Sequence, residues 1–104
     1  MRVAKVYLHN TLAGTLTETE FKKNYVFEYD AGYDGPVVSV TLPKGKVHEF
    51  NRFPPFFEGL LPEGENLEAL LKTMKIDRQD YFGQLVAVGQ DTVGAASILP
   101  EESE

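Results

Sequence analysis

The chain has 104 residues, of which 42% are apolar, and a formal net charge of −6. This length predicts one domain with a core of its own. The acidic charge argues against direct binding to nucleic acid, which depends on basic patches. The sequence has no cysteine and no apolar run of the roughly 18–20 residues that span a bilayer. We therefore expect a cytoplasmic protein without disulfides and without membrane association.

Residues 1–43 predict a β-meander. Four short segments of alternating apolar, aromatic or β-branched residues are separated by turns too short for crossover connections, so neighbouring strands should be antiparallel. These strands are expected at residues 2–8, 12–17, 25–29 and 37–42. Within the second strand, Gly14 indicates a bulge or a crowded position. Residues 44–52 are expected to form a polar loop.

Residues 53–89 predict a helical part. Five large apolar residues stand close together at its start: Phe53, Phe56, Phe57, Leu60 and Leu61. After them, leucines and Met74 recur at the spacing of one helix face, which predicts a helix over about 62–74 with Pro62 in its first turn. A second helix is expected to start at an Asp77 N-cap and to stop at Gly89.

Residues 90–104 predict the last strand and an acidic tail. We expect a turn at 90–94 and a strand at 95–99 that pairs back into the sheet. The whole is predicted to be a single α+β domain: a small antiparallel sheet, made of the meander and a C-terminal strand, with two or three helices packed on one face.

A search for catalytic and metal-binding patterns finds none. The two histidines, His9 and His48, lie in a predicted turn and a predicted loop without further ligands at metal-binding spacing. No serine lies in a GxSxG motif, and no glycine loop carries the lysine of a phosphate-binding motif. We therefore expect that the protein is not an enzyme and that it binds no cofactor and no metal ion. A carboxylate site around Asp30, Asp34 and Asp91 is the enzymatic alternative.

The aromatic segment is the strongest candidate for function. FPPFF (53–57) follows neither a strand period nor a helix period, so its rings cannot all point into one core. In one interpretation the cluster covers the open face of the sheet. In the other, part of it forms an exposed apolar patch rimmed by Glu58, Glu63 and Glu65, as in a protein interface. The two interpretations can share the segment, and the residues favour a binding module over an enzyme.

Two motifs also resemble a known family. PFFEGLLPEG (55–64) and GQDTVGAASILP (89–100) are similar, in sequence and order, to motifs in the N-terminal subdomain of HipA-type serine/threonine kinase toxins. Gly14-Thr15-Leu16 fits the pattern of that family's second strand, and the resemblance covers nearly the whole chain. Leu67 departs from the pattern, because the family often carries a basic residue there.

The resemblance implies a function. In the HipA family this subdomain precedes a kinase core, whereas the chain here ends at Glu104. It is therefore similar to the HipS-like antitoxins of HipBST toxin–antitoxin systems. That similarity implies a protein without catalytic activity that binds and neutralises a HipT-like kinase toxin, in a complex with a HipB-like DNA-binding protein. The alternatives are a detached N-terminal subdomain with a purely structural role and, against its acidic charge, a DNA-binding repressor.

We predict that the partner-binding surface lies on residues 56–65, which we call the elbow. Its predicted contact residues are Phe56, Phe57, Glu58, Leu60, Leu61, Pro62, Glu63, Gly64 and Glu65.

Overall fold

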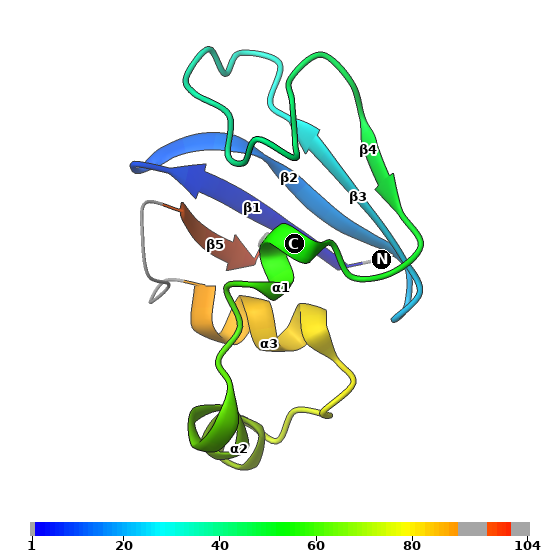
Figure 1. The fold of residues 1–104 in the computed structure, drawn as a ribbon, viewed down its shortest axis with the longest axis vertical. Helices are drawn as coiled ribbons and strands as arrows, with labels where there is room; N and C mark the ends of the chain where they lie inside the picture. Colours follow the sequence, from blue (N-terminus) through cyan, green and yellow to red (C-terminus); the bar gives the residue numbers. More distant parts are fainter. Residues whose placement is uncertain (1, 90–95, 101–104) are drawn as a thin grey trace.

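The computed structural model describes residues 2–89 and 96–100, and it shows a five-stranded antiparallel sheet with helices on one face (Figure 1). The strands are β1 (Arg2–Leu8), β2 (Thr11–Glu20), β3 (Asn24–Tyr29), β4 (His48–Phe50) and β5 (Ala96–Pro100), in the spatial order β4-β3-β2-β1-β5. The helices are α1 (Pro55–Glu58), α2 (Gly64–Met74) and α3 (Tyr81–Val88). The predicted α+β class is confirmed, including the C-terminal strand, which pairs with β1.

The predicted β1–β2 hairpin is present, but β2 runs over Thr11–Glu20 and is longer than the strand expected at 12–17. Leu8 pairs with Thr11, and the two residues between them, His9 and Asn10, have φ values of 51° and 67°. Positive φ at both central residues is typical of a type I′ turn, whose twist matches that of the two flanking strands. Further along, the register shifts opposite Gly14, where a side chain would strike the backbone of Glu28 on β3. Gly14 is therefore both next to a bulge and crowded.

The predicted strand at 37–42 is wrong. These residues form bends and turns, and the fourth strand, β4, lies instead within the segment that was predicted to be a polar loop. The hydroxyl of Tyr29 accepts a hydrogen bond from the Val38 N–H (2.9 Å) and donates one to the Leu42 carbonyl (2.5 Å). These bonds occupy backbone groups that a strand would use, and they hold Leu42 in the core while Val40 stays 90% exposed.

Both predicted helix starts also need correction. Pro62 precedes α2, whose N-cap is Glu63, because the chain stays extended as far as that residue. Asp77 does not cap α3. It accepts a hydrogen bond from the Gln79 N–H (2.7 Å) in the turn before it, and the N-cap is Asp80, whose carboxylate accepts from the Gly83 N–H (3.0 Å).

The helix does end at Gly89, as predicted, but for a different reason. Gly89 has an ordinary helical φ of −59°, so Gly89 is not a left-handed cap. A side chain on Gly89 would instead strike the backbone of Ile98 on β5. The predicted turn at 90–94 lies outside the described residues.

The core lies between the sheet and the helices α1 and α3. From the sheet it takes Leu16 and Phe27, and from the helices Phe57 and Leu85, all of them fully buried. The rings of Phe27 and Phe57 are 5.6 Å apart between centroids. Helix α2 lies beyond α3, away from the sheet (Figure 1). No described helix combines the length and the apolar character needed to cross a membrane.

Candidate protein-interaction site

The elbow is fixed at its first end by the core. Pro54 and Pro55 direct the chain into α1, where Phe57 is fully buried. Backbone hydrogen bonds then continue past the end of α1, from Leu60 N–H to the Phe57 carbonyl and from Leu61 N–H to the Glu58 carbonyl, both at 3.1 Å. The first part of the elbow is therefore anchored in the core by Phe57 and continues as a hydrogen-bonded turn.

The structure divides the nine predicted contact residues into two groups. Phe57 is a core residue, so it cannot contact a partner while the domain stays folded. The other eight reach the surface to different extents. Glu58, Glu63, Gly64 and Glu65 are exposed, and Phe56, Leu60, Leu61 and Pro62 are half-buried. The two interpretations of the aromatic segment thus share it: Phe53 and Phe57 fill the core, and the following residues line the surface.

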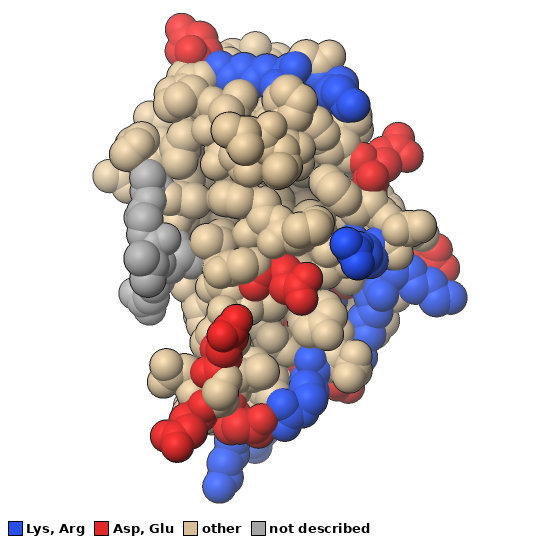
Figure 2. Space-filling view, viewed as in Figure 1, with Lys and Arg blue, Asp and Glu red and all other residues tan. Residues whose placement is uncertain are grey.

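The exposed part of the elbow is acidic. Among the described residues, the carboxylates of Glu58, Glu63 and Glu65 have no ion pair and no hydrogen bond. Figure 2 shows acidic side chains gathered over the segment between α1 and α2, with basic side chains beyond them toward the lower and right edges of the view. Gly64, in the middle of this stretch, has a φ of 61°, which favours glycine. The elbow thus presents unpaired negative charge on a backbone shape that few other residues allow.

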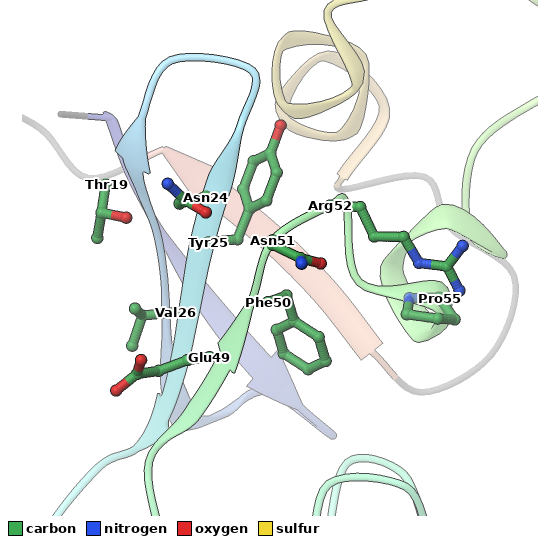
Figure 3. Close-up of a pocket in the computed structure, with 9 residues that line it drawn as sticks. All are labelled: Thr19, Asn24, Tyr25, Val26, Glu49, Phe50, Asn51, Arg52 and Pro55. Carbon is green, nitrogen blue, oxygen red and sulfur yellow. The ribbon is translucent and has the colours of Figure 1, made fainter.

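A separate hollow of about 850 Å³ lies beside β3 and β4 (Figure 3). Its charged residues are Glu49 and Arg52, whose side chains point in opposite directions. The lining also includes Thr19, Asn24 and Asn51, but no histidine or serine. The side chains do not converge on a point where a reacting atom could be held, so this hollow is a weaker candidate than the elbow.

The described residues include no group of three histidines, aspartates or glutamates close enough to hold a metal ion. Asp30 accepts a hydrogen bond from the Gly32 N–H (3.2 Å) and so shapes its own turn. His48 is buried and its ring is hydrogen-bonded to the Pro43 carbonyl (2.7 Å). Asp91, the third member of the alternative carboxylate site, lies outside the described residues.

The sequence analysis missed one cluster of charges that the fold brings together. Arg2 forms two hydrogen bonds with Glu18 (2.6 and 2.8 Å) and two with Asp80 (2.7 and 3.1 Å). Its guanidinium also lies over the ring of Phe82, 5.1 Å from the centroid. We call Arg2, Glu18 and Asp80 the arginine clamp. It ties β1, β2 and the start of α3 together, and so it positions the helical layer that carries the elbow.

A signal for the clamp is present in the sequence. Glu18 follows Leu16 by two residues on a strand, so both side chains lie on the same face, and Glu18 is only 2% exposed. A carboxylate on an apolar face requires a cationic partner. The alternation of β1 puts Arg2 on that face, and the register pairs it with Glu18.

The clamp also shifts the pKa values of Arg2 and Asp80. Hydrogen bonds with Glu18, and then with Asp80, hold the pKa of Arg2 above its ordinary value. For Asp80, burial raises the pKa, but the hydrogen bonds from Arg2 and from the Gly83 N–H, with the charge of Arg2, outweigh burial. The pKa of Asp80 is therefore lowered on folding.

Because folding lowers the pKa of Asp80, its charge contributes stability above its unfolded pKa of about 4, and this contribution is lost as the pH falls through the lower folded value. We expect Asp80→Asn, which keeps an oxygen to accept from Gly83, to be less stable at neutral pH and to lose less stability on acidification. Urea unfolding at a series of pH values measures both effects. Asp34→Asn, at an exposed aspartate, is the control for net charge. Parallel stability curves for Asp80→Asn and the unmutated protein would contradict the expectation.

Comparisons with known proteins agree with this architecture. The chain matches the model of the family described as HipA N-terminal domain over residues 4–99. It is 30% identical over 104 residues to an uncharacterized protein of Haemophilus influenzae, covering 98% of this chain and 95% of that protein. It is 25% identical over 99 residues to the serine/threonine-protein kinase toxin HipA of Shewanella oneidensis, but covers only 23% of that kinase.

Solved structures show the same fold. A structure described as the N-terminal domain of HipA toxin matches all of this chain and 96% of its own, with a TM-score of 0.77 and 27% identity. The Shewanella oneidensis HipA in its complex with HipB and operator DNA matches 96% of this chain and 24% of its own, with a TM-score of 0.76 and 21% identity. The protein is thus a small α+β domain of a class related to toxin–antitoxin systems. It belongs to the HipA N-terminal domain family.

Proposed function

We propose that the protein is an antitoxin that binds and neutralises a HipT-like serine/threonine kinase toxin by protein–protein contact. The observation that carries the proposal is the elbow: half-buried apolar residues under three unpaired carboxylates, on a HipA N-terminal domain. An acid-rimmed apolar surface of this kind suits a protein partner with a basic, partly apolar counterpart. The Haemophilus protein matches along 95% of its own length, so a domain of this kind also occurs there as most of a chain.

The mechanism we propose needs no chemistry from this chain. The elbow docks on the N-terminal lobe of the kinase, near the loop that covers the nucleotide, and holds the kinase in an inactive arrangement or blocks its substrate. Inhibition then requires only a higher affinity for the inactive state. A HipB-like DNA-binding protein would complete a three-component complex, and contact with DNA would pass through that partner. The proposed antitoxin is cytoplasmic, like its kinase.

Co-expression with a HipA-class kinase encoded beside this protein tests the proposal. We expect the two proteins to co-purify and the growth arrest caused by the kinase alone to be relieved. Purified protein should also lower kinase autophosphorylation in proportion to the amount of complex formed. A kinase that stays toxic and does not co-purify would contradict the antitoxin function.

The alternative is a non-catalytic N-terminal subdomain with a purely structural role. One observation favours it: the Shewanella kinase carries a similar domain as a small part of a longer chain. In that case the protein should stabilise a kinase core without inhibiting it. Co-purification with unchanged kinase activity would support this alternative and exclude the antitoxin.

A further inference from the structure

Helix α2 is incompletely covered. Leu67, Leu70 and Leu71 are half-buried, Met74 is 53% exposed, and no residue of the helix is fully buried. Helices of eleven residues are marginally stable by themselves and normally depend on a covered apolar face. Part of that face is therefore open in the isolated protein.

A groove of about 680 Å³ runs along one flank of this helix. Its lining comes from three parts of the chain: α2, including Ala69, Leu70, Thr73 and Met74, the last residue of α3, Val88, and elbow residues 59–62. The lining includes no charged side chain. Its volume is within the range of pockets that hold small ligands, about 300–1,000 Å³, and so it can accept a large side chain.

Acidic residues adjoin the groove lining in the chain. Pro62 and Asn66 line the groove, and the residues between them in the chain include Glu63 and Glu65, both exposed and without an ion pair among the described residues. An occupant that is apolar at its centre and basic on its flanks would bury the apolar wall and pair these carboxylates. An acidic or uniformly polar segment would do neither.

We propose that this groove binds a basic segment of the kinase partner, which inserts one large apolar side chain between α2 and Val88. The inference rests on the proposed function and adds to it a groove that extends from elbow residues 59–62 onto α2 and α3, and the chemistry of the segment that the groove receives. Hot-spot contacts of this kind, an apolar anchor in a pocket ringed by polar groups, contribute most of the affinity of many interfaces. Binding would also cover the exposed face of α2.

Filling the groove tests the inference without removing any core contact. Ala69 is exposed on α2 and lines the groove, so Ala69→Trp places a ring where the partner's side chain would lie. Lys72, three residues further along α2, is exposed and does not line the groove, and Lys72→Trp is the matched control. We expect Ala69→Trp to raise the Kd for the purified kinase about tenfold or more, and Lys72→Trp to change it less than about twofold. Circular dichroism of both variants checks that they stay folded.

The outcomes separate this inference from the proposed function. If the unmutated protein binds the kinase and Ala69→Trp binds equally well, the groove inference is wrong and the antitoxin function stands. If the unmutated protein does not bind the kinase, the proposed function fails, and a peptide then tests the groove. ¹⁵N-labelled protein is titrated with a short peptide that has one tryptophan between lysines. Shifts of the Leu70, Thr73 and Val88 amides, absent with a glutamate version of the peptide, support the groove, and their absence overturns it.

Discussion

The double variant Glu63→Lys/Glu65→Lys is expected to bind the kinase about 30- to 100-fold more weakly than the unmutated protein, with its fold intact. Each exposed ion pair contributes about 0.2–1 kcal/mol. Reversal replaces attraction by repulsion at two positions, so we expect a total loss of about 2–3 kcal/mol. Both side chains are exposed and, among the described residues, unpaired, so the substitutions break no internal contact. Isothermal titration with the purified kinase measures the change.

A control with the same change in net charge separates local contact from overall attraction. Asp34→Lys/Glu49→Lys reverses two exposed carboxylates away from the elbow, one in the loop after β3 and one on β4. We expect it to keep the affinity within about threefold, since exposed charges beyond a Debye length of about 8–10 Å are screened. The effect of the elbow variant should shrink at high salt. Equal losses for both double variants, or no loss for the elbow variant, would place the interface elsewhere.

Local patterns predicted most of the fold. The alternation of β1 and the aromatic run of β3 each predict their strand from a few neighbouring residues. Helix α2 follows from the spacing of its leucines. The elbow could be predicted as a surface feature because FPPFF has no period that would bury all of its rings.

Two of the failures depend on contacts between separate segments of the chain. Residues 37–42 read as a strand, but the hydroxyl of Tyr29 on β3 takes two of their backbone groups. Asp77 and Asp80 are equally good caps by residue type, and the clamp with Arg2, distant in the sequence, selects Asp80. The groove also requires tertiary structure, because Val88 reaches it from α3. Periodicity within one segment carries none of this information.

Of the substitutions discussed, Arg2→Ala is expected to lower the free energy of unfolding the most. Arg2→Ala leaves Glu18, 2% exposed, with one hydrogen bond from the Lys22 N–H and no cation. Breaking a fully buried pair costs about 3–5 kcal/mol. Since 35% of the Arg2 side chain is accessible to solvent, we expect about 2–4 kcal/mol in urea unfolding. That is a large fraction of the roughly 5–15 kcal/mol that stabilises a typical domain.

Two further variants separate the geometry of the clamp from its charge. Arg2→Lys keeps the positive charge, but an ammonium group cannot make two hydrogen bonds to each of the two carboxylates as the guanidinium does. We therefore expect Arg2→Lys to lose about half as much stability as Arg2→Ala. Lys23→Ala removes a cation from the exposed pair with Glu20 (3.7 Å) and should change stability by less than about 0.5 kcal/mol. If Arg2→Ala matched Lys23→Ala, the clamp would not hold α3 on the sheet. The orientation of the elbow, which precedes α3 in the helical layer, would then depend on apolar packing of the helices against the sheet, to which Phe57, Phe82 and Leu85 contribute.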